Sequence, residues 1–366
     1  MRRLLTLALF LIPALTGAQS APKRPKLDKD ADPNDWRSYY VAGVKGIQVN
    51  PSRSAELFWW ASRLSPGSAE PLHMRWVALS LANPRLLEEV PGRGSPEERL
   101  SERIDSVLFA ALEIDPFTHR QFSRLVYDAM PGVWGNDAFT NGFLAYTEGR
   151  YDLAVSHLRR AIGGRYARDA RYYRALSFHA LQRFDSAAAE LSTLADMARQ
   201  SNAARLRVVY DTPAVYEYGV GMARLRLNDF DGARTALLRA LEEDVAFAAA
   251  HSALAWVAQQ RGDTAEMLRE LELAVELRPG SGFYHDARGT ALRVAARLED
   301  AVMEYEQAIA LEPHWAAPYY NAALVLEQLG RKAEAARRYE EFVARAPRAY
   351  EQQAAHARAR ATALAQ

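Results

Sequence analysis

The stretch that decides the fold is Gly282–Pro313, GFYHDARGTALRVAARLEDAVMEYEQAIALEP. Its eighth, twentieth and twenty-seventh positions hold the small residues Gly289, Ala301 and Ala308, and Tyr305 stands in the twenty-fourth. Small residues at such positions let two antiparallel helices approach to about 8–10 Å. Proline cannot continue a helix, so Pro313 fixes the end of the second one. The stretch predicts a closely packed helix pair.

The same pattern recurs along the chain with a fixed period. Pro279, Pro313 and Pro347 are 34 residues apart. The eighth position holds Gly142, Ala175, Gly221, Ala255, Gly289 and Ala323, and the twentieth holds Ala154, Ala187, Ala233, Met267, Ala301 and Ala335. Successive twentieth positions are 33, 46, 34, 34 and 34 residues apart, which places an insertion within Asp196–Thr212. Six copies of one unit predict a stacked array rather than a single core.

This pattern resembles the tetratricopeptide repeat, with good specificity over residues 135–347 and loosely back to Trp36. The resemblance implies an all-α, right-handed superhelical solenoid of helix-turn-helix repeats. The turns repeat as well: Gly149, Gln182, Asn228 and Gly262 each stand just before the returning helix, close to an aspartate. Gly and Asn suit a left-handed C-cap, and Asp suits the start of a helix.

The N-terminal third is less regular. Residues 36–134 are expected to form repeat-like helices, the first with Gly43, Ala55 and Trp59 in the eighth, twentieth and twenty-fourth positions. Asn83–Gly94 is an insertion, and Ser95-Pro96 begins the next helix with a capping-box spacing. A further helix is expected over Phe117–Met130 and has no clear partner. Thr212-Pro213 caps a later helix, and extended residues are expected near Arg207–Tyr210.

The two ends of the chain have different compositions from the array. Residues 1–18 have a basic start (Arg2, Arg3), an apolar run and small residues at the end, which is the plan of a secretory signal peptide cleaved after Ala18. An uncleaved anchor is the alternative, although the run is shorter than the roughly 20 residues of a spanning helix. Residues 19–35 predict a flexible linker, and residues 348–366 a C-terminal capping helix.

Composition restricts the possible functions. The 46 basic and 45 acidic residues nearly cancel, so neither nucleic acid nor an anionic membrane is favoured as a partner. The chain has no cysteine, which removes disulfides, thiolate metal sites and cysteine nucleophiles. It also has no phosphate-binding glycine loop and no metalloprotease or serine-hydrolase motif. No cofactor, metal or catalytic residue is therefore predicted.

Histidines in adjacent repeats offer the one possible metal pair. His251 and His285 stand at corresponding positions of neighbouring copies, where other copies carry Tyr39 or Tyr319. No third ligand is evident. Simple packing of both side chains is therefore the favoured interpretation.

The best functional signal is a row of large residues on the first helices. In tetratricopeptide arrays these helices face the concave side, mainly through their second, fifth, ninth and twelfth positions. Those positions predict a peptide- or partner-binding groove lined by Phe139, Phe143, Tyr146, Tyr172, His179, Tyr218, Met222, Trp256, Phe283 and Tyr320. The alternative is that several of them pack in the interhelical core. The Lys and Asn that clamp a carboxylate tail in the chaperone-binding variety are replaced here by Phe139 and Phe143, so that mode is rejected.

The resulting hypothesis is a non-enzymatic scaffold, periplasmic or secreted, that holds an extended peptide or a helix of a partner protein. A part in cell-envelope assembly or secretion is an expectation from the family alone. The alternative is an enzyme, or an enzyme accessory, with a site in the irregular region 36–134. A self-associating structural array is a third possibility.

Overall fold

The computed structural model describes residues 22–88, 94–117, 137–200 and 212–365, together with 123–124, 127–128 and 135. All regular structure in these residues is helical. The N-terminal helices are α1 (Trp36–Gly46), α2 (Pro51–Leu64), α3 (Ala69–Ala82), α4 (Arg85–Glu88) and α5 (Pro96–Ile114). The expected signal peptide, the helix after Phe117 and the extended residues near Arg207–Tyr210 lie outside the described residues or almost wholly so.

Six helix pairs follow, as the repeat spacing predicts. They are α7 (Ala138–Thr147) with α8 (Tyr151–Ala161), α9 (Ala167–Ala180) with α10 (Phe184–Arg199), α11 (Pro213–Arg226) with α12 (Phe230–Glu243), α13 (Ala248–Gln260) with α14 (Thr264–Leu277), α15 (Gly282–Val294) with α16 (Leu298–Leu311), and α17 (Ala317–Gln328) with α18 (Lys332–Arg345). A short 3-10 turn, Arg348–Tyr350, leads into α19 (Glu351–Leu364). Consecutive helices pack on one another throughout the array. The all-α solenoid is confirmed.

The small residues of the repeat lie where two helices come closest. A methyl group on Gly289 would lie 2.8 Å from Cε1 of Tyr305, and one on Gly142 would lie 2.6 Å from Cγ of Leu158. These distances are too short for any side chain, so glycine is required for the close approach. The twentieth-position alanines are fully buried, and Met267, the one larger residue there, is buried as well.

The inter-helix turns need a left-handed backbone, and not only at glycine. Gln182 and Ala296 have φ of 59° and 57°, beside Asn228 at 57°. A non-glycine residue in this region carries a conformational cost, which the packed helices on either side must outweigh. Asp229 and Asp263 then cap the returning helices by accepting from the backbone N–H of Gly232 and Glu266, both at 2.9 Å.

The first helix pair has a different register from the one that the sequence predicts. Phe58, not Trp59, faces Gly43, whose added methyl would lie 2.7 Å from the Phe58 ring. Ser54 takes the place predicted for Ala55 and donates from its hydroxyl to the carbonyl of Gly43 at 2.9 Å. The reason is the length of the turn, because α2 begins one residue earlier relative to α1 than α16 does relative to α15.

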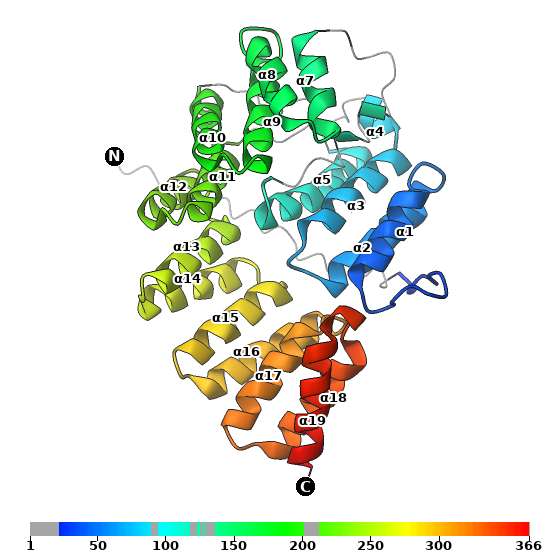
Figure 1. The fold of residues 1–366 in the computed structure, drawn as a ribbon, viewed down its shortest axis with the longest axis vertical. Helices are drawn as coiled ribbons and strands as arrows, with labels where there is room; N and C mark the ends of the chain where they lie inside the picture. Colours follow the sequence, from blue (N-terminus) through cyan, green and yellow to red (C-terminus); the bar gives the residue numbers. More distant parts are fainter. Residues whose placement is uncertain are drawn as a thin grey trace.

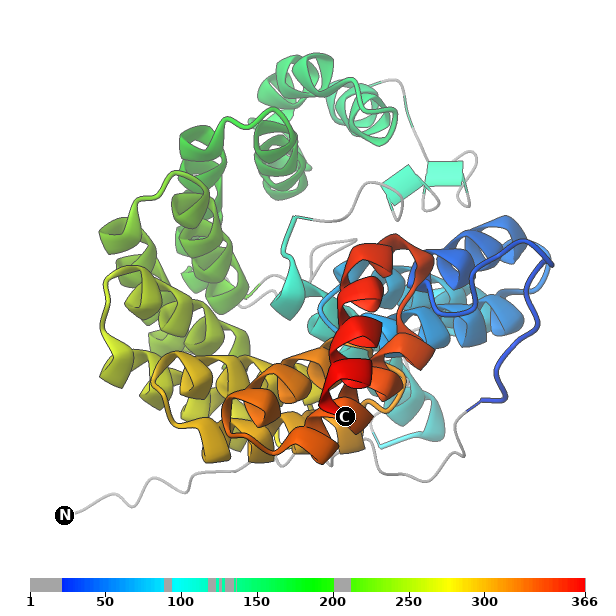
Figure 2. The same cartoon turned by 60° about the horizontal axis from the view of Figure 1, so that its bottom comes forward.

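The N-terminal helices lie across the open side of the arc that the six pairs form (Figures 1 and 2). Arg63 of α2 forms an ion pair with Glu312 at 2.7 Å, and the Trp60 ring lies 4.9 Å from that of His314. Two regions about 250 residues apart in sequence are thereby joined. The chain closes on itself instead of ending as an open superhelix.

Residues 22–35 take part in this closure instead of forming the flexible linker that their composition predicts. Trp60 donates from its indole N–H to the carbonyl of Pro22 at 3.0 Å, and Arg24 donates to the hydroxyl of Tyr39 at 2.8 Å. Asp32 accepts from the backbone N–H of Arg348 at 2.7 Å. The segment therefore lies between the first helix pair and the C-terminal turn.

Candidate peptide-binding surface

The ten residues predicted to line a groove divide by burial. Phe139, Phe143, Tyr146, Tyr172 and Tyr218 are buried, with Phe143 fully inaccessible; His179, Met222, Phe283 and Tyr320 are half-buried; Trp256 is 41% exposed. The burial of the first five corrects the expectation of an open aromatic row. For Trp256 an accessible binding role stays a prediction.

The buried aromatics of the first regular pair pack against the next pair. The ring of Phe143 lies 4.7 Å from that of Tyr173 in an edge-to-face arrangement, and the Tyr146 ring lies 5.3 Å from the same tyrosine. The α7 and α9 helices are in direct contact, so the concave-facing positions of α7 meet side chains of α9. Aromatic pairs of this geometry stabilise a core beyond the area they bury.

Three of the predicted residues contact the chain's own N-terminal region. Tyr218 donates from its hydroxyl to the carbonyl of Glu113 at 2.8 Å. His179 stacks on the ring of Phe117, with centroids 3.9 Å apart and planes 2° from parallel. Phe283 lies against Gly67, 3.1 Å from where a methyl on that glycine would stand. The inner surface of the array therefore holds a polypeptide segment, namely the end of α5 and the residues after it.

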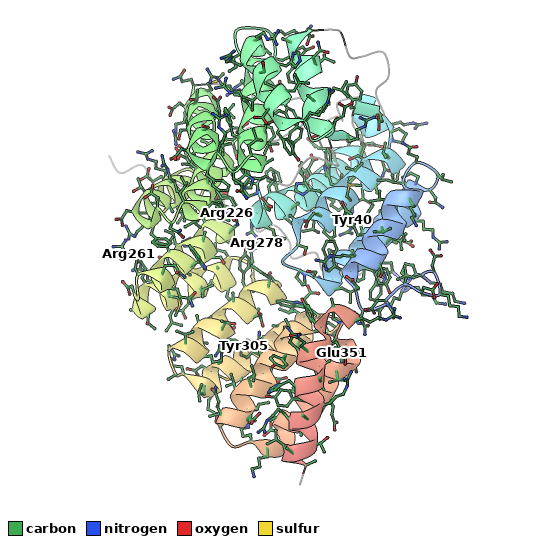
Figure 3. All side chains as sticks on the ribbon, in the orientation of Figure 1. Tyr40, Arg226, Arg261, Arg278, Tyr305 and Glu351 are labelled. Atoms are coloured by element: carbon green, nitrogen blue, oxygen red, sulfur yellow. The ribbon has the colours of Figure 1, made fainter. Side chains whose placement is uncertain are left out.

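An ion pair fixes this segment at the centre of the molecule. Arg278, at the C-terminal end of α14, donates to the carboxylate of Glu113 at 2.8 Å, and Figure 3 shows it beside the end of α5. Burial raises the pKa of the Glu113 carboxyl, and the guanidinium of Arg278 acts in the opposite direction. Burial, together with nearby Asp115 and Glu113, also raises the pKa of Tyr218 well above its usual range, so its hydroxyl stays a proton donor.

Apolar contacts complete the docking of α5. Leu108 and Leu112, one helical turn apart, are buried in one cluster with Val215 of α11 and Leu254 of α13. Tyr218 belongs to the same cluster and lies 5.0 Å from the ring of Phe247. One face of α5 thus meets the array, while α5 also packs on α3 of its own region.

The two corresponding histidines each have a carboxylate partner in their own repeat. Nδ1 of His251 lies 2.7 Å from Glu270, and Nδ1 of His285 lies 2.7 Å from Glu304. In the second pair of the array, Glu190 takes the same position and pairs with Arg171 and Arg174. A buried carboxylate on the second helix paired with a cation on the first is therefore a recurring device of the array. The described residues contain no group of three or more side chains suited to a metal ion.

A polar hollow of about 350 Å³ lies on the array, not in the irregular region where an enzyme site was considered. It is lined by Asp152, Val155, Ser156 and Arg159 of α8, Arg174 and Phe178 of α9, and Arg183. Arg183 stands over the ring of Phe178 at 4.7 Å. Within the part of the chain that the structure describes, no helix is long and apolar enough to cross a membrane.

Sequence reasoning missed Glu113, Phe117 and Arg278. The contact between Glu113 and Arg278 spans 165 residues, and repeat spacing carries no information about such pairs. One signal was available, because a glutamate in the last turn of a helix is unfavourable beside the negative end of the helix dipole. Such a residue suggests a cation from elsewhere in the fold.

Comparisons with known proteins agree with the repeat geometry. A family model described as tetratricopeptide repeat matches residues 140–202 and 218–282, and a second model with this description matches residues 319–349. The matched helix pairs are tetratricopeptide repeats. An uncharacterized protein of Haemophilus influenzae is 32% identical over 100 residues, which are 27% of this chain and 56% of that protein. The match thus spans little more than half of that relative.

Solved structures with a similar fold align with parts of the chain. MamA is 18% identical, with 47% of this chain and 94% of that chain covered and a TM-score of 0.40. YrrB, described as a TPR protein with an unusual peptide-binding site, is 16% identical, with 56% and 98% covered and a TM-score of 0.42. The C-terminal part of a TPR repeat-containing protein from Cytophaga hutchinsonii is 14% identical, with 57% and 78% covered and a TM-score of 0.46.

Proposed function

We propose that this chain is a protein-binding scaffold without catalytic activity of its own, which holds a segment of a partner protein on the concave side of its repeats. The observation that carries the proposal is the docked end of α5. A side-chain hydroxyl bound to a backbone carbonyl, an arginine paired with a carboxylate and a stacked ring are the contacts by which proteins recognise peptides. The tetratricopeptide repeats over residues 140–349 support the same function.

Trp256 is the accessible residue through which a partner would first be held. Its side chain is 41% exposed although a buried tryptophan is far more favourable, and its ring lies 5.8 Å from that of Phe230. Exposed tryptophans concentrate binding energy at interfaces, because they bury a large area with little loss of entropy.

Capture of a partner on the immobilised chain tests this function. We expect a protein from the cell-envelope fraction to be retained by the chain beginning at Gln19 and lost with Trp256→Ala, by a factor of about thirty in affinity for a hot-spot residue. Met303→Ala is the matched control, since Met303 is a 60% exposed apolar residue on a second helix. Equal retention by the wild type and Trp256→Ala would disprove this binding surface.

We also propose that the protein is exported and acts in the periplasm or outside the cell, with a part in envelope assembly or secretion. The basic start and apolar run of residues 1–18 support export, and the lack of cysteine is compatible with an oxidising compartment. N-terminal sequencing of the protein from the envelope fraction should begin near Gln19. A chain that begins at Met1 would contradict cleavage.

A further inference from the structure

Resting on the proposed function, we propose that the inner surface of α9, α11 and α13–α15 is a receptor for the C-terminal end of an amphipathic helix with an acidic residue in its last turn and an aromatic residue just beyond it. The end of α5 occupies this receptor in the structure. A partner helix with the same pattern would compete with α5 for it.

The apolar half of the receptor recognises a helix by its spacing. Leu108 and Leu112 are four residues apart and both are almost fully buried against α11 and α13. Side chains at this spacing lie one above the other on a single helix face. An apolar pair four residues apart is the pattern by which an amphipathic helix is held in a groove.

The polar half recognises the end of the helix. The last four carbonyls of a helix have no partner within it. Glu113 is the residue before the last of α5, and Tyr218 donates to its carbonyl. Phe117, three residues beyond the helix, stacks on His179. A helix that continued past this point would leave Tyr218 without its acceptor and would have no ring against His179.

The acidic residue sets the register. A carboxylate in the last turn opposes the helix dipole, and burial adds to its cost. Arg278 offsets both through its bond to Glu113. Buried ion pairs contribute more to a unique arrangement than to stability in the best-attested cases. A partner helix without the acid would leave Arg278 unpaired next to Tyr284 and is therefore discriminated against.

Occupancy by α5 should lower the apparent affinity for any partner helix. The apparent dissociation constant rises in inverse proportion to the fraction of molecules with an open receptor. Two changes raise that fraction without touching the receptor. Leu112→Ala weakens the docked segment itself, and Arg63→Ala weakens the contact with Glu312 that holds the N-terminal helices against the array.

A fluorescent peptide of residues 101–117, SERIDSVLFAALEIDPF, is the probe, and its binding to the full chain is measured by anisotropy. We expect weak binding to the wild type and binding about tenfold tighter or more to Leu112→Ala and to Arg63→Ala. In both backgrounds Arg278→Ala should remove the gain. A peptide carrying Glu113→Lys should bind none of these chains.

Two outcomes would overturn the proposal. One is that the peptide fails to bind Leu112→Ala and Arg63→Ala while circular dichroism shows the array intact. The other is binding that is unchanged by Arg278→Ala and by Glu113→Lys in the peptide. The proposed function fails separately, when no envelope protein is retained by the wild-type chain. A retained protein that the peptide does not displace would leave that function standing and reject α5 as the mimic.

Discussion

At the scale of single residues, the array depends on where side chains are absent as much as on where they are present. Gly289 faces Tyr305 and Gly221 faces Leu237, in each case with no room for one more carbon atom. The sequence spacing predicts these positions correctly, because the period alone identifies them. The distances explain why two of the three are glycine where the facing residue is an aromatic or leucine that fills the gap.

Gly289→Ala should therefore destabilise the protein. The new methyl would stand 2.8 Å from Cε1 of Tyr305, and the ring is fully buried and cannot move freely. We expect a loss of roughly 1–3 kcal/mol in the free energy of unfolding, measured by chemical denaturation. Gly280→Ala is the control, since a methyl there meets nothing within 4 Å. Equal effects of the two changes would show that the close approach is not what requires glycine.

The pair of His285 and Glu304 should make stability depend on pH. The bond to Glu304 raises the pKa of His285 above its usual range, although burial acts against it. Both ring nitrogens face acceptors, because Nε2 lies 3.1 Å from the carbonyl of Pro279. The charged, doubly protonated imidazole is thus the form that the folded state favours.

Since the folded-state pKa is the higher one, the stabilisation is complete below the unfolded pKa of about 6.5 and is lost as pH rises through the folded value. The difference in unfolding free energy between the wild type and His285→Gln should be constant below about pH 6 and shrink at higher pH. Denaturant titrations from pH 5 to 9 measure it. A difference that grows with pH would contradict a charged His285.

Which carboxylate pairs with which cation could not be predicted from the sequence. Position in the repeat identifies His251 and His285 as equivalent, and their packing interpretation needed no partner. The structure adds Glu270 and Glu304 on the facing helix. Glutamates are common on exposed helix faces, so nothing in the sequence distinguishes the buried ones from the rest.

At the scale of elements, the boundaries that follow from caps were predictable and those that depend on neighbours were not. Ser95 accepts from the backbone N–H of Glu98 at 3.0 Å, as the capping-box spacing predicts. The shorter turn after α1 was missed, because a change of one residue in a loop leaves the pattern of apolar residues nearly intact. Phe58 and Trp59 are both aromatic, so either fits the sequence pattern.

The C-terminal helix α19 covers the last repeat. Its Ala354, Ala357 and Ala361 are buried in one cluster with Tyr339 and Phe342 of α18. Terminal repeats need such a cover, because the interface that a following repeat would bury is otherwise exposed to water.

Removal of residues 351–366 should destabilise the last repeat. Tyr339 and Phe342, now almost fully buried, would be exposed, at a cost of about 1.5–3 kcal/mol for each side chain. We expect faster amide hydrogen exchange across α17 and α18, with the earlier pairs less affected. Arg358→Ala is the control, because its ion pair with Glu351 is exposed and should contribute nothing measurable. Unchanged exchange in α18 would show that α19 is not a cap.

At the scale of the whole molecule, closure decides what the inner surface can reach. The contact between Arg63 and Glu312 and the stacking of Trp60 on His314 hold the N-terminal helices across the mouth of the arc (Figure 2). Repeat grammar describes each unit and its next neighbour only, so an open superhelix was the natural expectation. The closing contacts involve no residue that the repeat pattern marks.

Glu312 makes the closure sensitive to pH. It is buried, and its second carboxylate oxygen has no hydrogen-bond partner among the described residues. Burial raises the pKa of Glu312 to about 7, and Arg63 opposes the rise. An acid with a raised folded-state pKa favours the protonated folded form. Its contribution to stability therefore falls as pH rises from about 4.3, the unfolded value, to about 7.

Arg63→Ala should therefore open the molecule at high pH and not at low pH. At pH 8 the variant leaves an unpaired carboxylate in a buried position, which costs roughly 1–3 kcal/mol. At pH 5.5 Glu312 is neutral and the closed form survives. Small-angle X-ray scattering should show a larger radius of gyration for the variant at pH 8 only, and the double change Arg63→Ala with Glu312→Gln should stay closed at both. Arg37→Ala, at a 65% exposed arginine paired with Asp35, should not open at either pH. A variant as compact at pH 8 as at pH 5.5 would mean that α5 and the inner surface hold the ring closed without this ion pair.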